Sequence, residues 1–277
     1  MLVSIILLLA MVDIPMEKSI ILLYSSRGKE MMMVSFDKKE MKAFKLQGST
    51  PDLSPDGRRI AFADSGAIHI MDVNGKVLKR ITVEGGMCTS PDWSPDGRKV
   101  IFGVLFMKEK NTEIFEADVE TGKVTRLTFT QETEFSPRWM PDGKRILFAS
   151  GRGIPDFLRL LDVATGKAED ITPKGLLCCQ PYPSPDGGSV VFLGVSGAVK
   201  YGVFVMDLKS GEVKRVTEKE RCRSPIFSPD GRMVMYQAEG AVWVKDLEGG
   251  EERVFLEKEL LPSSWGYPLY RYGVSPK

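Results

Sequence analysis

The segment Ser-Pro-Asp-Gly, with Met-Pro-Asp-Gly in one copy, occurs five times along this chain and constrains its fold more than any other feature. Its aspartates stand at positions 56, 96, 142, 186 and 230, so successive copies are 40, 46, 44 and 44 residues apart. A nearly fixed period of this size indicates a repeat architecture. We therefore expect several similar units arranged in series.

The chemistry of the motif indicates a tight turn. Proline fixes φ near the value that the second position of a β-turn needs, serine and aspartate bond nearby amides, and glycine adopts positive φ. Apolar residues flank each copy, as Trp93 and Val100 do around the second one. We expect structural turn roles for Asp56, Gly57, Asp96, Gly97, Asp142, Gly143, Asp186, Gly187, Asp230 and Gly231.

A second glycine-bearing turn, such as Asp118 to Gly122, ends another strand within each unit. The two turns together give four strands in each period, which is typical of a β-propeller blade. Strands that occupy the place after the motif recur near Ile21, Ile60, Val100, Ile146, Val190 and Val234. We predict an all-β fold, a six-bladed β-propeller of four-stranded antiparallel blades.

The first unit, from Lys18, has no turn motif of its own, so one more inner strand is needed to close the ring. The C-terminal tail carries aromatic residues suited to that strand, namely Trp265, Tyr267, Tyr270 and Tyr272. Closure removes the exposed edges that an open array would leave. We expect one propeller domain, residues 17–277, closed by its N- and C-terminal segments.

Residues 1–16 allow two interpretations. The apolar run at residues 1–12 is too short to span a membrane easily and resembles the centre of a secretory signal, although no Lys or Arg precedes it. It is either a signal or anchor, or an N-terminal strand of the first unit. The first interpretation favours an extracytoplasmic protein (periplasmic, secreted or membrane-anchored) that touches a membrane only through this segment if it is uncleaved. The second leaves a cytoplasmic location open.

Charge and cysteine content exclude several classes. The 38 basic and 37 acidic residues leave a formal charge of +1 with no basic block, so the composition does not indicate nucleic-acid binding. The spacings of the four cysteines match no zinc finger or ribbon. We predict no cofactor.

The repeated pattern around Pro91, Trp93 and Ser94-Pro95-Asp96-Gly97, continued by Val100 and Phe102, resembles the TolB-like β-propeller repeat, which is related in shape to WD40-like repeats. The resemblance covers the chain from about Lys18 onward. It implies a six-bladed propeller that is often extracytoplasmic, usually a binding platform, and sometimes the accessory domain of a prolyl-oligopeptidase-like peptidase. TolB carries an additional N-terminal α/β domain, and we expect this chain to lack it.

Catalytic motifs are not apparent. The string Gly194-Val195-Ser196-Gly197 lacks the spacing of a nucleophile elbow. The single histidine, His69, takes the place that Phe115 and Arg159 take in other units, so we expect an ordinary strand side chain. We therefore predict a non-enzymatic binding or scaffold protein. The alternatives are a sugar lyase or lactonase-like propeller enzyme and a detached peptidase accessory domain.

Inner strands of a propeller run toward the turn motif, so residues several places before it lie at the opposite face, here called the funnel face. Six residues before the motif stand Gly48, Cys88, Glu134, Cys178 and Cys222. One hypothesis is a thiol-rimmed funnel for a soft metal or a thiol-reactive ligand. The other is that this position takes a small, partly buried side chain.

Loops at the funnel face are the longest and most variable, and rigid β scaffolds usually carry function on such loops. Their mixed charges suit a protein or peptide partner at a polar rim. We predict a monomer that binds its partner there, with no metal and no catalytic residue. The candidate partner-binding residues are Cys88, Lys108, Glu134, Arg152, Cys178, Cys179, Cys222 and Arg223.

Overall fold

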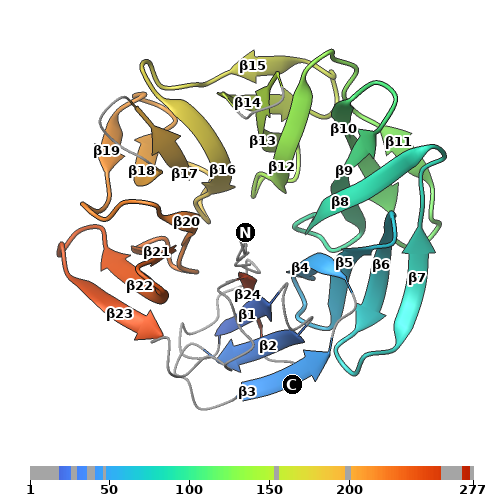
Figure 1. Ribbon diagram of the computed structural model, residues 1–277, viewed down its shortest axis with the longest axis horizontal. Coiled ribbons are helices and arrows are strands. Elements are labelled where there is room, and N and C mark those ends of the chain that lie inside the picture. Colours follow the sequence, from blue (N-terminus) through green and yellow to red (C-terminus); the bar gives the residue numbers. More distant parts are fainter. Residues whose placement is uncertain are drawn as a thin grey trace.

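The computed structural model describes residues 19–25, 30–35, 41–45, 48–152, 156–196, 201–256 and 270–274. The predicted signal or strand at residues 1–16, the loop residues 153–155, and Trp265 and Tyr267 lie outside the described residues. Four-stranded antiparallel sheets are arranged in a ring around a central axis (Figure 1). No helix in the described part of the chain is long and apolar enough to cross a membrane.

Five blades are each built from one contiguous segment of chain. Blade 1 contains β4 (Ser49–Leu53), β5 (Arg59–Asp64), β6 (Ala67–Asp72) and β7 (Val77–Ile81). Blade 2 contains β8 (Gly86–Trp93), β9 (Lys99–Phe106), β10 (Asn111–Asp118) and β11 (Val124–Arg126). Blade 3 contains β12 (Thr133–Trp139), β13 (Arg145–Gly151), β14 (Phe157–Asp162) and β15 (Ala168–Asp170). Blade 4 contains β16 (Leu177–Pro183), β17 (Ser189–Val195), β18 (Gly202–Asp207) and β19 (Val213–Arg215), and blade 5 contains β20 (Arg223–Phe227), β21 (Met233–Ala238), β22 (Ala241–Asp246) and β23 (Glu252–Leu256).

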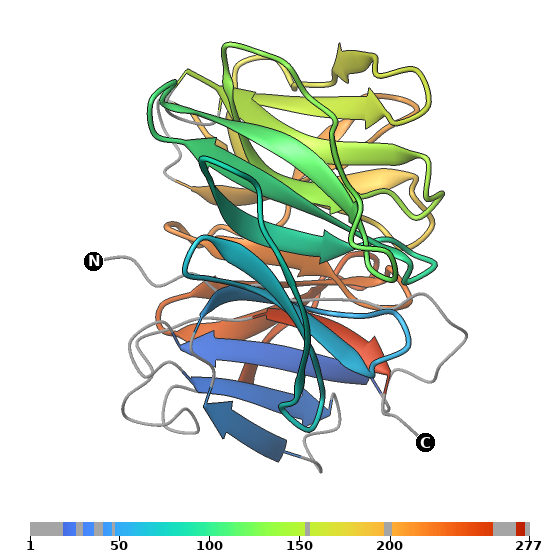
Figure 2. The ribbon, with the colours of Figure 1, turned by 90° about the vertical axis from the view of Figure 1, so that its right-hand side faces the viewer.

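The closing sheet combines the two ends of the described chain. It consists of β1 (Ser19–Ser25), β2 (Glu30–Ser35), β3 (Met41–Lys45) and β24 (Tyr270–Val274). The inner strand β24 pairs antiparallel with β1, with Tyr272 opposite Ile21, and Figure 2 shows it among the strands of the N-terminal segment. The all-β propeller of four-stranded antiparallel blades is confirmed. Of the six blades counted from sequence, five are contiguous repeats, and the remaining four-stranded sheet is this composite one, because the first unit has no inner strand of its own.

All five Pro-Asp-Gly motifs form the turn between the first two strands of a blade. In the second motif the Gly97 amide donates to the Ser94 carbonyl oxygen at 2.9 Å, and the Ser94 hydroxyl donates to Asp96 Oδ1 at 2.6 Å. The motif glycines have φ between 64° and 73°, a region that other residues enter only at a cost. The turns also stack around the ring, since a Cβ on Gly187 would lie 3.5 Å from Pro141 of the preceding blade.

The inner strand of each of the five contiguous blades carries a bulge at the residue before its proline. These five residues are Thr50, Ser90, Ser136, Gln180 and Ser224, with φ between 47° and 51°. A non-glycine residue in this region costs about 1–2 kcal/mol. Hydrogen bonds between consecutive blades offset part of that cost. The Ser90 amide donates to Thr50 Oγ1 at 3.1 Å, and the Ser224 amide donates to Gln180 Oε1 at 2.8 Å.

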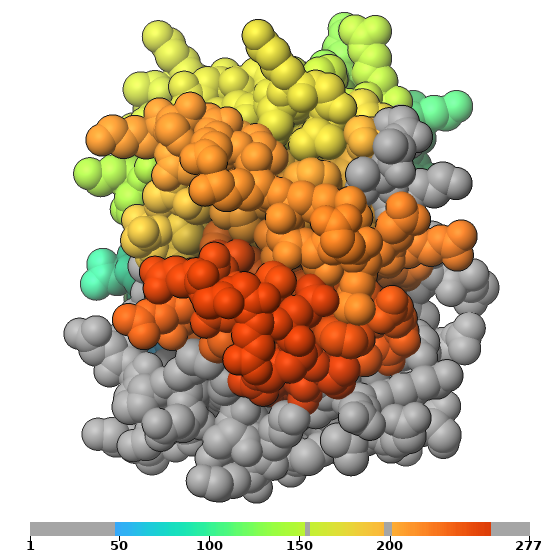
Figure 3. All heavy atoms as spheres, turned by 90° about the vertical axis from the view of Figure 1, so that its left-hand side faces the viewer, coloured from blue at the N-terminus to red at the C-terminus, as the bar shows by residue number. Residues whose placement is uncertain are grey.

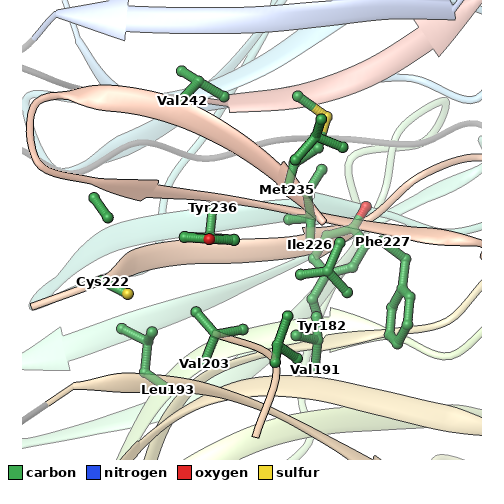
Figure 4. Close-up of a cluster of buried hydrophobic side chains, with 14 of the residues drawn as sticks. Tyr182, Val191, Leu193, Val203, Cys222, Ile226, Phe227, Met235, Tyr236 and Val242 are labelled. Atoms are coloured by element: carbon green, nitrogen blue, oxygen red, sulfur yellow. The ribbon is translucent and has the colours of Figure 1, made fainter. Parts of the chain in front are cut away.

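The hydrophobic core lies between neighbouring blades. One cluster joins blades 4 and 5, where Val191 and Leu193 of β17 face Ile226 and Tyr236 of blade 5 (Figure 4). Figure 3 shows the same two blades in direct contact at the surface. Fully buried aromatic side chains such as Phe192 and Tyr236 each contribute on the order of 2–3 kcal/mol by leaving water.

A candidate partner-binding cavity on the funnel face

The structure places the first residues of the inner strands at the face opposite the turns, as the sequence indicated. Backbone bonds tie these residues to the loop between the second and third strands of the preceding blade. The Cys88 amide donates to the Gly66 carbonyl at 3.1 Å, the Cys178 amide to that of Asp156 at 3.3 Å, and the Cys222 amide to that of Tyr201 at 2.9 Å. Little space remains beside such a close approach, which favours small side chains at this level.

The thiols are part of the packing between blades. Cys88, Cys178 and Cys222 are buried in three different hydrophobic clusters, and Figure 4 shows Cys222 beside Tyr236. Burial raises the pKa of the Cys178, Cys179 and Cys222 thiols to about 12, so they are protonated at neutral pH. They do not form a shared rim. Within the described residues no group of three or more His, Cys, Asp or Glu side chains is placed to hold a metal ion.

A cavity of about 490 Å³ opens on the funnel face between blades 1, 2 and 3. This volume lies in the range typical of small-ligand pockets. Apolar walls are formed by Met87, Leu105 and Phe135, and hydroxyl groups come mainly from the inner strands. The ionisable side chains on its lining are Asp64, Cys88 and Glu134, and the described lining contains no Lys or Arg.

Blade 2 forms the tallest wall of this cavity. Its strands β9 and β10 are eight residues long, and they carry Leu105 and Thr112 beyond the level reached by the six-residue strands of blade 1. On the opposite side the Ser65-Gly66 turn of blade 1, with φ of 47° and 78°, turns the chain tightly. Unequal strand lengths in adjacent blades therefore create the hollow.

Glu134 is the buried charged group of the cavity. It lies on β12 with 1% exposure, and its Oε1 accepts a hydrogen bond from the Thr130 hydroxyl at 2.8 Å. Its Oε2 is buried without a hydrogen-bond partner, while Ser150, directly across the ladder, donates to Glu132. Burial raises the pKa of Glu134, although the Ser150 and Thr130 hydroxyls and the nearby Arg159 oppose this rise, and the Glu113 carboxylate adds a little to it.

Two further carboxylates bond to groups that neighbour Glu134, and each is already paired. Glu113 accepts from Arg126 at 3.0 Å and from the Thr130 amide at 3.0 Å. Glu132 accepts from Arg159 at 2.7 Å. Both arginines are thus engaged with other carboxylates.

Exposed apolar side chains concentrate on the funnel face. Among the described residues, nine large apolar side chains are exposed. Six belong to strand starts or loops of this face: Met87, Met107, Phe129, Phe157, Leu177 and Tyr201. Phe129 is 75% exposed and Met107 is 64% exposed. Apolar groups gathered at one end of a molecule mark an interaction surface more often than scattered ones do.

The opposite end of the central channel holds a smaller cavity of about 60 Å³. It is lined by the prolines of four turn motifs together with Asp92, Arg138 and Tyr182. Asp92 Oδ1 accepts from Arg138 at 2.9 Å, and its Oδ2 accepts from the Trp139 amide at 2.8 Å. Burial raises the pKa of Asp92 to about 6, although Arg138 opposes this. This arrangement links the inner strands of the adjacent blades 2 and 3 beside the channel.

The candidate residues from sequence separate into three groups. Cys88 and Glu134 line the funnel-face cavity. Lys108 and Arg152 are exposed at the rim, and Arg223 is half-buried at the start of β20. The remaining cysteines pack between blades: Cys178 in the cluster that joins blades 3 and 4, and Cys179 and Cys222 in the cluster that joins blades 4 and 5. His69 stacks on Phe62, with ring centroids 5.2 Å apart, inside blade 1.

Sequence reasoning missed Asp64, Met87 and Phe129. Asp64 and Met87 line the cavity, and Phe129 is the most exposed large apolar residue described. An aromatic residue between two threonines in a loop, as in Thr128-Phe129-Thr130, is a signal that could have been used. The position of Asp64 at the cavity follows only from the packing of blade 1 against blade 2.

The ring of four-stranded blades with a cavity at one mouth defines a β-propeller with a funnel-face pocket. Residues 48–247 match the family described as the TolB beta propeller domain, and the chain belongs to this family. A comparison with curated proteins finds no significant match.

Solved structures share the fold. TolB from Acinetobacter baumannii is 24% identical, with a TM-score of 0.76 over 95% of this chain and 68% of that one. A protein from Agrobacterium tumefaciens assigned as TolB is 18% identical, with a TM-score of 0.68 over 86% of this chain and 88% of that one. An oligogalacturonate lyase in complex with manganese is 13% identical, with a TM-score of 0.64 over 83% of this chain and 74% of that one.

Proposed function

We propose that this chain is a non-enzymatic binding propeller that engages a protein or peptide partner through its funnel face. The observation that carries the proposal is the gathering of exposed apolar side chains on the funnel face, among them Met107 and Phe129, together with a cavity of about 490 Å³ that opens on the same face. Protein-binding surfaces combine apolar anchors with a polar rim, and the exposed Lys108 and Arg152 supply such a rim. The similarity to TolB structures supports the same class of function through the fold alone.

The motif aspartates and His69, which sequence reasoning weighed as catalytic candidates, have structural roles. The motif aspartates cap their own turns, as Asp96 does by accepting from the Arg98 amide at 3.0 Å. His69 is stacked within its blade. A sugar lyase remains the alternative because an oligogalacturonate lyase shares the fold, but that likeness concerns architecture only.

Selection of random displayed peptides on the immobilised protein tests this proposal. Selected peptides should lose about tenfold or more in affinity for Phe129→Ser, because burial of an anchor on this scale contributes at least 1.4 kcal/mol. Leu78→Ser is the matched control, since Leu78 is 49% exposed on the outer strand β7. Equal losses in both variants, or no enrichment of peptides at all, would contradict binding at the funnel face.

A further inference from the structure

Five blades repeat the same inner-strand position, and one of them departs from the pattern. Residues six places before the turn motif are Gly48, Cys88, Glu134, Cys178 and Cys222. The cysteines are buried among apolar groups, and a Cβ on Gly48 would lie only 2.6 Å from the Phe62 ring. Packing therefore favours a small side chain at the sixth residue before the turn motif. Among these five blades, only blade 3 has a carboxylate at this position.

A buried carboxylate at this position is costly without compensation. A charge removed from water is tolerated when it is paired and its oxygens are hydrogen-bonded. Thr130 satisfies only Oε1 of Glu134, and Oε2 has no hydrogen-bond partner. Arg126 pairs with Glu113, and Arg159, whose charge influences Glu134, pairs with Glu132. Glu134 Oε2 is thus a buried acceptor that receives no hydrogen bond from the described chain, because the Ser150 hydroxyl beside it donates to Glu132.

The surroundings of this acceptor match a cation on an apolar stem. Asp64 lies across the same cavity, and within the described residues no ion pair involves it. Lysine and arginine side chains bury their methylene stems against apolar surface while the charged end reaches polar groups. Met87, Leu105 and Phe135 offer the apolar walls, and Ser90 and Ser136 offer hydroxyl acceptors.

We propose that the funnel-face cavity receives a lysine or arginine side chain of the bound segment, with its positive end paired to Glu134 and Asp64. This inference rests on the proposed function, because it names the chemistry that the funnel face recognises. The exposed apolar residues then provide general contact, and the cavity provides specificity for a basic residue. Charge-assisted hydrogen bonds of this kind are about twice as strong as neutral ones.

The test uses N-acetyl-argininamide as the probe and N-acetyl-citrullinamide as its neutral isostere. Binding is followed through the methyl resonance of Met87 in protein labelled with [13C]methyl-methionine, assigned by Met87→Leu. We expect a saturable shift with the arginine probe and about tenfold or weaker binding of the citrulline probe, which corresponds to the loss of one charged contact. Equal binding of both probes, or no shift of Met87, would overturn the inference.

Glu134→Gln is the decisive variant, because glutamine keeps an acceptor for Thr130 and removes only the charge. It should bind the arginine probe about tenfold more weakly at an unchanged melting temperature. Glu220→Gln is the control, since Glu220 is exposed before β20 on the same face and outside the cavity lining. Unchanged affinity in Glu134→Gln would refute the pairing. If selected peptides depend on Phe129 but not on Glu134, the funnel-face function stands and this inference fails.

Discussion

The contact between Asp92 and Arg138 provides the sharpest test of how the blades are held together. Asp92 is 1% exposed, and its two oxygens accept from Arg138 at 2.9 Å and from the Trp139 amide at 2.8 Å. Arg138 is 9% exposed, and its guanidinium lies 5.5 Å from the Tyr182 ring centroid on blade 4. One carboxylate thus supports contacts that extend over blades 2, 3 and 4.

Asp92→Ala should lower the free energy of unfolding by about 3–5 kcal/mol, because it leaves a buried guanidinium without its counter-ion. Asp92→Asn keeps an acceptor for the Trp139 amide and should lose much less than Asp92→Ala, because burial already disfavours the charge of Asp92. Combining Asp92→Ala with Arg138→Met removes the uncompensated charge and should recover much of the loss. Urea unfolding followed by tryptophan fluorescence measures all three. A loss below about 1 kcal/mol for Asp92→Ala would refute the reasoning.

The same group predicts a pH dependence. Burial raises the pKa of folded Asp92 from its ordinary value of 3.8 to about 6, so between these values the folded chain binds more protons than the unfolded chain. The contribution of this group to stability therefore falls as the pH rises from about 4 to about 6. In Asp92→Asn, which has no titrating group at this position, this pH dependence should be absent. A pH profile of the unfolding free energy that is identical in the wild type and this variant would contradict the raised pKa.

Three further predictions concern single groups. Gly143→Val should destabilise the protein by about 1–3 kcal/mol, because φ of 64° with no heavy atom near the added Cβ leaves backbone strain as the cost; an unchanged melting temperature would refute the turn geometry. Cys178 should react with iodoacetamide only as fast as the chain unfolds, since its buried thiol has a pKa of about 12; rapid labelling of native protein, seen by mass spectrometry, would contradict this. Binding of the arginine probe should weaken as the pH falls through the raised pKa of Glu134, and an affinity independent of pH would count against an ionised partner.

Local chemistry explains which features the sequence predicts. The turn motif can be recognised from sequence because its stabilising bonds are local: Ser94 bonds to both Asp96 and Gly97 within four residues. The blade repeat and its closure follow from the same local patterns. By contrast, the bond from Asp92 to Arg138 spans 46 residues, and nothing near either residue in the sequence indicates its partner. Such contacts can be identified only once the structure shows which strands of neighbouring blades pack against each other.

The cavity was not predictable for a related reason. The sequence placed Glu134 and the cysteines at one level of the ring, and the structure keeps them there. Their surroundings differ, however, because strands β9 and β10 of blade 2 extend further than those of blade 1 and open a hollow beside Glu134. A shared position therefore does not imply a shared site, which is why the thiol rim does not form.

Side chains that differ between the repeats at one inner-strand position favour the native order of the blades around the ring. The residue after the inner-strand proline is Asp52, Asp92, Arg138, Tyr182 or Ile226 in successive blades. Asp52 accepts from the Trp93 amide at 2.8 Å, Asp92 pairs with Arg138, and Arg138 lies over Tyr182, so these side chains reach the following blade. If the blades exchanged neighbours, Arg138 could face Ile226 and lose its carboxylate, at the cost of an unpaired buried charge. Uniform turns make the blades alike enough to pack, and these unlike pairs penalise packing in the wrong order.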